Sequence, residues 1–251
     1  MKNIATLYFI LSCLIACKPA VTGANDASQE GMLKSTLDKH LKTPINKIEA
    51  TNIEGVSAVF FENGDVIYSD KTGKNFIAGN FFSIVENKDG SSQIKNITQL
   101  FHDENRIKSL KQIDKSDMIV FPAEGKKKTH IYVFTDIDCY YCQKLHKEVP
   151  ALNKGGVEVR YLGFPRSGLN TPSYKKLQSA WCSEDKLTAM NKLKSRQTVE
   201  EKNCDSNAIA QQFELGQKLG VNGTPAIITS TGKLISGYMK ANQLVQRLEL
   251  P

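Results

Sequence analysis

The stretch that decides the fold is Ile131-Tyr132-Val133-Phe134-Thr135-Asp136-Ile137-Asp138-Cys139-Tyr140-Tyr141-Cys142. Its first four residues are β-branched or aromatic, which favours a buried strand. Residues 143–152, which follow, carry a helical pattern that Pro150 interrupts. The two cysteines therefore lie where a strand gives way to a helix. Because two residues separate them, both thiols occupy one face of the first helical turn.

That position suits thiol chemistry. The start of a helix offers free amide N–H groups and the positive end of the helix dipole, and both stabilise a thiolate. A lower thiol pKa increases the reactive fraction and improves the leaving group. A C-x-x-C between a strand and a helix is typical of a thioredoxin-like redox motif. We therefore predict that Cys139 is the nucleophile and that Cys142, one turn deeper, is the resolving thiol.

Two other interpretations of the C-x-x-C are an inert buried pair and half of a zinc site. The chain has six cysteines, namely Cys13, Cys17, Cys139, Cys142, Cys182 and Cys204. Zinc sites often combine two C-x-x-C pairs, but Cys182 and Cys204 are 22 positions apart. We therefore expect no metal and no cofactor. The short spacing of the first pair favours the pairings 139–142 and 182–204 among the alternatives.

Residues 1–24 are expected to be a signal segment rather than part of the fold. Lys2 is followed by an apolar run, residues 4–16, that is too short to span a bilayer comfortably. Leu14-Ile15-Ala16-Cys17 resembles the bacterial lipobox, in which cleavage precedes a cysteine that becomes lipidated. Ordinary cleavage near residues 22–24 is the alternative. The first mode leaves a lipid anchor on Cys17, and the second discards that residue.

The composition is that of an ordinary globular protein. Of the 251 residues, 40% are hydrophobic and 24% are charged, which excludes a largely disordered or collagen-like chain. The length suggests one or two domains. The formal net charge is +7, but the basic residues are spread along the chain, and the tightest basic run, Lys126-Lys127-Lys128, has no interleaved aromatic residues. We therefore expect no nucleic-acid partner.

The first expected domain, residues 25–90, combines a helix with a small antiparallel sheet. Apolar residues at helical spacing favour a helix over residues 25 to about 50, with Thr43-Pro44 as its end. Asn63-Gly64 separates residues 56–61 from the next β-prone run and is a strong hairpin signal. This part of the sequence holds no cysteine and no cluster of histidines or carboxylates. We therefore expect a unit for assembly rather than for chemistry.

Residues 91–117 are expected to form a mostly helical linker with a charged polar face, and residues 118–251 a second domain. In the second domain the order is strand, helix, strand, helical insertion, strand, strand and helix. The insertion is expected at residues 173–194 and 206–219, and a hairpin at residues 226–235. The predicted fold class is α+β.

Gly223-Thr224-Pro225 precedes the strand expected at residue 226. By itself, Gly-Thr-Pro at a strand entry is an ordinary turn signal. In a thioredoxin-like fold, a cis-proline loop packs beside the C-x-x-C, and the exposed backbone before the proline can pair with an extended substrate segment. Because the C-x-x-C lies about eighty residues upstream, we predict that Thr224 and Pro225 form a substrate-binding loop.

These residues together resemble the periplasmic protein disulfide isomerases of the DsbC/DsbG family. The motifs that carry the resemblance are Val133-Phe134-Thr135-Asp136, Tyr141-Cys142, Lys144-Leu145-His146, Arg160-Tyr161-Leu162, Phe164-Pro165-Arg166, Gly168-Leu169, Trp181-Cys182, Cys204, Leu219-Gly220-Val221, Gly223-Thr224-Pro225-Ala226 and Gly237-Tyr238. Residues 118–251 match strongly, whereas residues 25–117 match in layout more than in residues.

The resemblance implies a homodimer that pairs through its N-terminal domains. Two thioredoxin-like domains would then face a cleft that binds unfolded chains through apolar surface, with weak chaperone activity. The resemblance also implies a structural disulfide between Cys182 and Cys204. A membrane thiol reductase of the DsbD type would keep Cys139 and Cys142 reduced. The substrates would be misfolded exported proteins with wrong disulfides.

Four residues in or near the C-x-x-C could influence its two thiols. Tyr140 stands where the family commonly has glycine. Asp138 places a negative charge beside the nucleophile, which would disfavour a thiolate, but we favour a helix cap that faces water. Asp136 either relays a proton to the buried thiol or acts as a cap. His146 lies on the helix face of Cys142, and we favour an exposed surface histidine.

The predicted function is thiol–disulfide interchange that isomerises or reduces incorrect disulfides. One alternative is a dithiol oxidase or a sulfenic-acid reductase of the same fold. A second is a non-catalytic periplasmic holdase chaperone. Thr224 before Pro225 and the N-terminal domain favour the isomerase, because oxidases of this fold are usually monomers without that domain. Activity that survives the loss of both Cys139 and Cys142 would favour the holdase.

Overall fold

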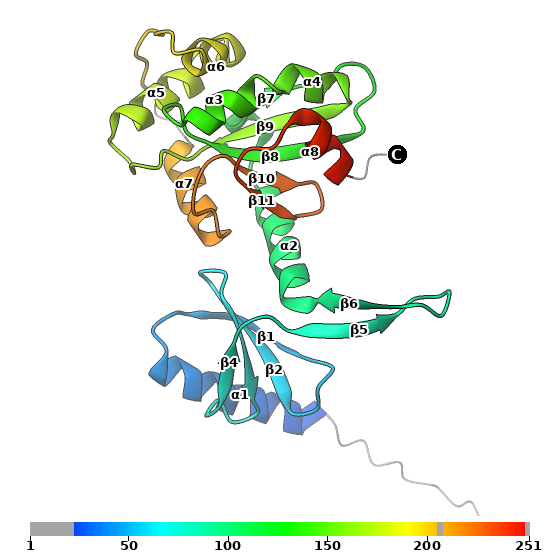
Figure 1. Ribbon diagram of the computed structural model, residues 1–251. Coiled ribbons are helices and arrows are strands. Elements are labelled where there is room, and N and C mark those ends of the chain that lie inside the picture. The colour runs from blue at the N-terminus through cyan, green and yellow to red at the C-terminus, as the bar shows by residue number, and fades with distance from the viewer. Residues whose placement is uncertain (1–22, 205–207, 249–251) are drawn as a thin grey trace, which may run out of the picture.

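Helix α2, Ile97–Leu110, joins two separately packed parts of the chain (Figure 1). The computed structural model describes residues 23–204 and 208–248. The expected signal segment, with Cys13 and Cys17, lies outside the described residues apart from its last two positions. The architecture is α+β, with an N-terminal antiparallel sheet and a C-terminal thioredoxin-like domain, so the predicted fold class is confirmed.

The N-terminal part is a four-stranded antiparallel sheet with one helix against it. Its elements are α1 (Gly23–His40), β1 (Ile45–Ala50), β2 (Val56–Phe61), β3 (Val66–Asp70) and β4 (Phe76–Ala78), and the strand order is β1-β2-β3-β4. Leu33 and Leu37 of α1 pack with Val59 and Ile67 of the sheet. Gly64 has a φ of +89° in the turn between β2 and β3, which explains the Asn-Gly signal.

The first helix ends just before Thr43-Pro44, where its end was expected, although the helical pattern ran on to about residue 50. It ends at His40, and residues 45–50, which the helical pattern included, form β1 beside β2. Ile45 and Ile48 pack against the core of the N-terminal sheet from this strand. Pairing with β2 satisfies the backbone of the segment after Pro44, so tertiary contact overrides the local helical spacing.

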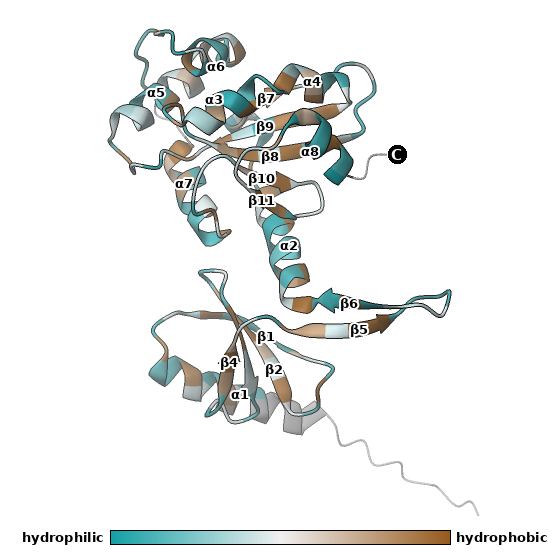
Figure 2. Cartoon of the chain, in the orientation of Figure 1, coloured by the Kyte–Doolittle hydropathy of each residue, from teal (hydrophilic) through white to brown (hydrophobic). Residues whose placement is uncertain are grey.

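The expected helical linker also begins as a strand. β5 (Phe82–Glu86) and β6 (Ser92–Asn96) form a two-stranded sheet that extends away from both parts of the molecule (Figure 1). Phe82, Ile84 and Ile94 on this hairpin are exposed, and Figure 2 shows the apolar residues along β5. Asn96 then begins α2, because its side chain accepts a hydrogen bond from the Gln99 amide at 3.0 Å.

Helix α2 is docked on the C-terminal part. Arg106 is buried, and its Nε donates to the Leu219 carbonyl at 3.1 Å while its Nη1 contacts Asp103 at 2.8 Å. Gly232 has a φ of +90°, and a Cβ atom there would lie 1.9 Å from the Asp103 carbonyl oxygen. The turn at Gly232 therefore packs directly against α2, and this position requires glycine.

The C-terminal part is built on a five-stranded sheet of order β11-β10-β8-β9-β7. Its strands are β7 (Ile119–Phe121), β8 (Thr129–Thr135), β9 (Val157–Gly163), β10 (Ala226–Thr229) and β11 (Leu234–Ser236). β8 and β9 are parallel, and the other neighbours are antiparallel. The edge strand β7, which follows the short 3₁₀ helix η1 (Lys115–Asp117), had no separate sequence prediction.

Helices cover both faces of this sheet. They are α3 (Tyr140–His146), α4 (Val149–Lys154), α5 (Pro172–Trp181), α6 (Lys186–Lys194), α7 (Ile209–Lys218) and α8 (Ala241–Arg247). Ile131 and Val133 of β8 face one core, and Tyr132 and Phe134 face the other. β8 is thus buried on both sides, as its continuous apolar run predicts. Within residues 23–204 and 208–248, no helix has the length and apolar character needed to cross a bilayer.

Candidate active site

Cys139 is the residue at which α3 begins. Its backbone is extended, with φ −82° and ψ 118°, and its Sγ accepts a hydrogen bond from the Cys142 amide at 3.4 Å. Both cysteines are buried and neither is in a disulfide. The sulfur of Cys139 therefore serves as the cap of the helix, where the unpaired amides and the helix dipole act on it directly.

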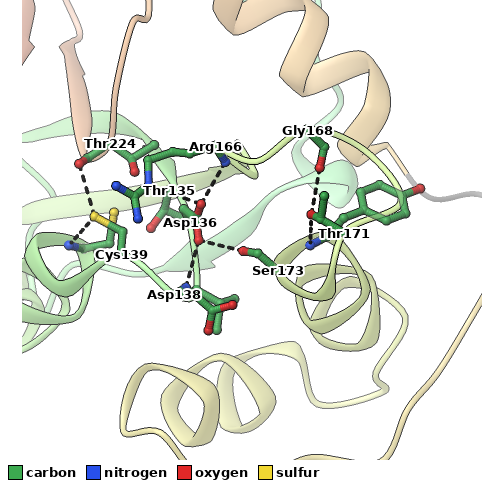
Figure 3. A network of polar contacts seen from close by, with 12 residues as sticks. Thr135, Asp136, Asp138, Cys139, Arg166, Gly168, Thr171, Ser173 and Thr224 are labelled. Carbon is green, nitrogen blue, oxygen red and sulfur yellow. Dashed lines mark hydrogen bonds and ion pairs between the residues drawn. The ribbon is translucent and has the colours of Figure 1, made fainter.

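The loop before β10 reaches the same sulfur. Ala226 of β10 pairs with Phe134 of β8, so the residues just before β10 lie beside the end of β8 that leads to the C-x-x-C. The Thr224-Pro225 bond is cis, and the Cys139 thiol donates to the Thr224 carbonyl at 3.2 Å (Figure 3). The Thr224 hydroxyl is buried and has no hydrogen-bond partner within the described chain.

The two thiols differ sharply in acidity. A hydrogen bond from the Cys142 thiol lowers the pKa of Cys139 to about 5 although burial opposes this, and Thr224, the Cys142 amide and the charge of Arg166 add to the lowering. Burial first, and then the hydrogen bond to Cys139, raise the pKa of Cys142. At neutral pH one sulfur is therefore a thiolate and the other a thiol.

Asp136 anchors the loop that carries the C-x-x-C. Its carboxylate is 2% exposed and accepts hydrogen bonds from the Asp138 amide at 2.8 Å, the Ser173 hydroxyl at 2.6 Å and the Arg166 amide at 2.8 Å (Figure 3). Burial opposes ionisation, but these hydrogen bonds outweigh it and lower the pKa of Asp136. The Asp136 carboxylate is thus held by hydrogen bonds from these three residues. Through them it connects the end of β8 to the loop after β9 and to α5.

Asp138 is not the helix cap, because Cys139 occupies that position. The expectation of an Asp138 cap is therefore wrong, although the side chain does face water. Its carboxylate pairs with Lys176 at 2.7 Å, and both side chains are about half exposed. The lysine partly offsets the negative charge that Asp138 places beside Cys139.

The expectation of an exposed His146 is also wrong. Its two ring nitrogens contact the Tyr161 hydroxyl at 3.1 Å and the Asn191 side chain at 2.9 Å. Burial, followed by the charge of Lys194, lowers the pKa of His146 to about 4. The ring is therefore neutral at physiological pH and links α3 to β9 and α6.

Two exposed tyrosines lie between the two cysteines of the C-x-x-C. Tyr140 and Tyr141 are 61% and 54% exposed. Tyr141 stacks on Tyr238 with a centroid separation of 6.5 Å, and the Tyr238 hydroxyl donates to Glu148 at 2.8 Å. The bulky Tyr140 is therefore accommodated by pointing outward rather than by packing between the sulfurs.

The second cysteine pair lies in the helical insertion. Cys182, at the end of α5, forms a disulfide with Cys204. This bond closes a 22-residue loop that contains α6. The structure thus brings Cys139, Cys142, Thr224 and Pro225 together and places the disulfide outside that cluster, while Cys17 lies beyond the described residues. No group of three metal-ligating side chains occurs among the residues described.

Sequence reasoning missed Lys194, which is buried close to the C-x-x-C. Lys194 is the last residue of α6 and lies four positions after the buried Met190. That spacing puts it on the apolar face of the helix. The signal that would have found it is a lysine in register with buried residues, where an apolar side chain is expected.

A buried C-x-x-C at the start of a helix, faced by a cis-proline loop on a helix-covered mixed sheet, defines a thioredoxin-like thiol–disulfide oxidoreductase. Two family profiles match the chain. One describes a thioredoxin-like domain and matches residues 115–250, and the other describes the N-terminal domain of a disulfide bond isomerase protein and matches residues 21–99.

Relatives match along almost the whole chain. The thiol:disulfide interchange protein DsbC of Escherichia coli (strain K12) is 33% identical over 241 residues, which cover 96% of this chain and 94% of the relative. The DsbC of Haemophilus influenzae (strain ATCC 51907 / DSM 11121 / KW20 / Rd) is 31% identical over 229 residues, or 91% and 94%. The chain belongs to the DsbC family of thiol:disulfide interchange proteins, and its activity is thiol–disulfide interchange.

One solved structure shows the shared fold of the C-terminal part. The catalytic domain of Proteus mirabilis ScsC is 20% identical and has a TM-score of 0.50. The match covers 60% of this chain and 96% of that domain.

Proposed function

We propose that the protein isomerises or reduces incorrect disulfides in exported proteins, with Cys139 as the nucleophile and Cys142 as the resolving thiol. The observation that carries this proposal is the unequal acidity of the pair. Cys139 is the helix cap with a pKa of about 5, whereas the pKa of Cys142 is raised. Only Cys139 is therefore an anion ready to attack at neutral pH.

The reaction follows from the different acidities of Cys139 and Cys142. The Cys139 thiolate attacks a substrate disulfide, one substrate sulfur leaves as a thiolate, and a mixed disulfide forms. In isomerisation, a substrate thiolate attacks the mixed disulfide, forms a new substrate disulfide and returns Cys139 as a thiolate without net electron transfer. In reduction, Cys142 attacks the Sγ of Cys139. The substrate then leaves with two electrons, and Cys139 and Cys142 become a disulfide.

The Thr224 loop is proposed to hold the substrate. Its carbonyl lies 3.2 Å from the Cys139 sulfur, at the point where β10 begins. An extended segment that paired with the backbone of Thr224 would bring its own cysteine next to Cys139. The Thr224 carbonyl accepts a hydrogen bond from the protonated Cys139 thiol, and in the thiolate form it would accept one from the substrate backbone instead.

The remaining assignments extend this proposal to the whole protein. Residues 25–90 are assigned to dimerisation, residues 91–117 to the linker and residues 118–251 to catalysis. The exposed apolar side chains of the β5–β6 hairpin support an assembly surface. We place the protein in the periplasm, exported by residues 1–24, with a lipid on Cys17 under lipobox cleavage. A membrane thiol reductase of the DsbD type would return the oxidised pair to the dithiol.

Reactivation of a substrate with scrambled disulfides, in a glutathione buffer, tests the proposal. We expect reactivation by the wild type and none by Cys139→Ser. Rapid oxidation of a reduced substrate without reactivation would instead establish a dithiol oxidase. If the double variant Cys139→Ser, Cys142→Ser still assists refolding, the assistance belongs to a chaperone surface and not to the thiols.

A further inference from the structure

Lys194 is a buried charged residue close to the C-x-x-C, and the reaction above gives it no role. Its residue is 2% exposed at the end of α6. Its Nζ donates to the Thr135 hydroxyl at 2.6 Å and to the Asp136 carbonyl at 2.9 Å. Among the described residues, no carboxylate forms an ion pair with it. A buried lysine without a carboxylate partner is costly and calls for an explanation.

Lys194 and Cys142 share their neighbours. The carbonyl of Asp136 accepts a hydrogen bond from Lys194, and the amide of the same residue hydrogen-bonds the Cys142 sulfur. Tyr161 lies next to both, because the Lys194 Nζ is 5.7 Å from its ring centre and the charge of Cys142 adds to burial in raising the pKa of Tyr161. The contact between α3 and α6 holds this arrangement. The ammonium therefore lies on the Cys142 side of the pair.

The electrostatic influences on Lys194 and Cys142 also indicate that these two groups interact. Burial raises the pKa of Cys142 most, and the positive charge of Lys194 is the largest influence that lowers it. Burial also lowers the pKa of Lys194, and the anion of Cys142 is the largest influence that raises it. The other titratable groups that face Lys194 are Asp136, Asp138, Cys139, His146 and Tyr161.

We propose that Lys194 is a positioning residue for the resolving step, and that its positive charge stabilises the thiolate which Cys142 forms before it attacks Cys139. This inference rests on the roles proposed above for the two cysteines. A lysine ammonium has three N–H donors, and Thr135 and Asp136 use two of them. These two hydrogen bonds therefore fix the ammonium group against the segment of chain that leads to the C-x-x-C.

The step balances without another reactant. Cys142 gives its proton to water, and its sulfur forms a bond with the Sγ of Cys139. The bond between Cys139 and the substrate sulfur breaks, and the electron pair leaves with the substrate, which takes up a proton from water. The substrate sulfur is reduced, the two cysteines are oxidised to a disulfide, and Lys194 keeps its proton throughout.

This role has a consequence for the activity. A mixed disulfide that Cys142 resolves slowly gives a substrate thiolate time to attack, which is isomerisation. A mixed disulfide that Cys142 resolves quickly is released as reduced substrate. By stabilising the Cys142 thiolate, Lys194 therefore shifts the balance towards reduction.

The test compares Lys194→Met with Lys192→Met, which makes the same change at an exposed position of the same helix. The reduced full-length protein is mixed with an equimolar aromatic disulfide, 5,5′-dithiobis(2-nitrobenzoate). The first thiolate released reports attack by Cys139, and the second reports resolution by Cys142. In Lys194→Met we expect the second phase at neutral pH to slow by about tenfold, equal to one unit of thiol pKa, and its pH profile to move upward. The first phase should change by less than about threefold, since the charge acts mainly on Cys142.

Each result has a defined meaning. A second phase that is unchanged in Lys194→Met overturns the inference. Equal slowing of both phases also overturns it, because that pattern indicates a structural role only. A wild-type protein that releases no first thiolate refutes the proposed function instead, and Lys192→Met should match the wild type in both phases.

A second measurement covers the case in which Lys194→Met does not fold. In Cys139→Ser, Cys142 is the remaining thiol among the described residues. We expect the ε-carbon resonance of Lys194, followed by NMR, to shift as Cys142 ionises. A Lys194 resonance that does not respond to the ionisation of Cys142 overturns the inference.

Discussion

The sulfur of Cys139 lies 3.2 Å from the carbonyl oxygen of Thr224, although 85 residues separate them in the sequence. The antiparallel pairing of β10 with β8, which sets Ala226 opposite Phe134, produces this contact. One loop therefore places a backbone acceptor beside the Cys139 sulfur. The geometry of the site depends on a strand register and not on the C-x-x-C alone.

The reactivity of Cys139 should follow a titration far below that of an ordinary thiol. We expect the alkylation rate by iodoacetamide to be flat near neutral pH and to fall as the pH drops through about 5, because only the thiolate reacts. The ordinary thiol pKa is 9.0. Alkylation that rises steadily between neutral pH and that value would contradict the assignment. Mass spectrometry of the modified peptide identifies the residue.

Removal of the Cys142 thiol should raise the pKa of Cys139. The hydrogen bond from that thiol is the largest influence that lowers the Cys139 pKa, and alanine removes it. Cys142→Ser keeps a hydroxyl donor at the same place and should raise the pKa less than Cys142→Ala does. The same alkylation titration measures both variants. Equal titrations in wild type and Cys142→Ala would show that the helix start alone sets the acidity.

Asp136→Asn should destabilise the folded protein by about 2 kcal/mol near neutral pH, because it weakens buried hydrogen bonds to a charged group. The folded-state pKa of Asp136 is below the ordinary value of 3.8. Its contribution to stability is therefore complete above that value and is lost as the pH falls towards the folded-state pKa. Urea unfolding at neutral and acid pH measures the difference.

The control for this change is Asp138→Asn. Asp138 is two residues away, but its carboxylate is about half exposed and pairs with Lys176 at the surface. We expect a loss of at most about 1 kcal/mol there. A loss of unfolding free energy as large as that of Asp136→Asn would show that burial does not decide how much each carboxylate contributes to stability.

Loss of the Cys182–Cys204 disulfide should destabilise the protein by about 3 kcal/mol, since the bond closes a loop over 22 positions and restricts the unfolded chain. The double variant Cys182→Ser, Cys204→Ser tests this by urea unfolding. We expect the first-phase thiol reaction of Cys139 to survive wherever the variant is folded. Loss of that reaction in folded protein would mean that the reactivity of Cys139 depends on the helical insertion.

Gly232→Ala should loosen the contact between α2 and the C-terminal part. Its new Cβ would lie 1.9 Å from the Asp103 carbonyl, and the φ of +90° disfavours alanine. Gly237→Ala is the matched control, because Gly237 has a φ of +87° but nothing within 4 Å. We expect the first change to cost about 2 kcal/mol more in unfolding free energy. Equal losses would show that backbone strain alone acts at both positions.

Much of the fold was visible in local patterns. The hairpin at Asn63-Gly64, the strand before Cys139 and the helical insertion all appear where short-range periodicity and turn chemistry predicted them. Errors occurred where long-range pairing decides the outcome. Residues 45–50 and 92–96 are strands because β2 and β5 lie beside them, and no local signal reports that pairing.

The sequence by itself determined the dithiol, its place between a strand and a helix, and the family to which the chain belongs. Local spacing suffices for these, because a C-x-x-C at a helix start needs only residues close together in the chain. The tertiary structure decided which groups act on the two sulfurs. The Thr224 loop was expected beside the C-x-x-C, but only the packed fold sets its carbonyl against Cys139. Lys194 reaches the pair from a segment that no sequence pattern placed beside it, and burial separates the acidity of the two thiols. Desolvation and charge depend on neighbours in space, which only the packed fold supplies.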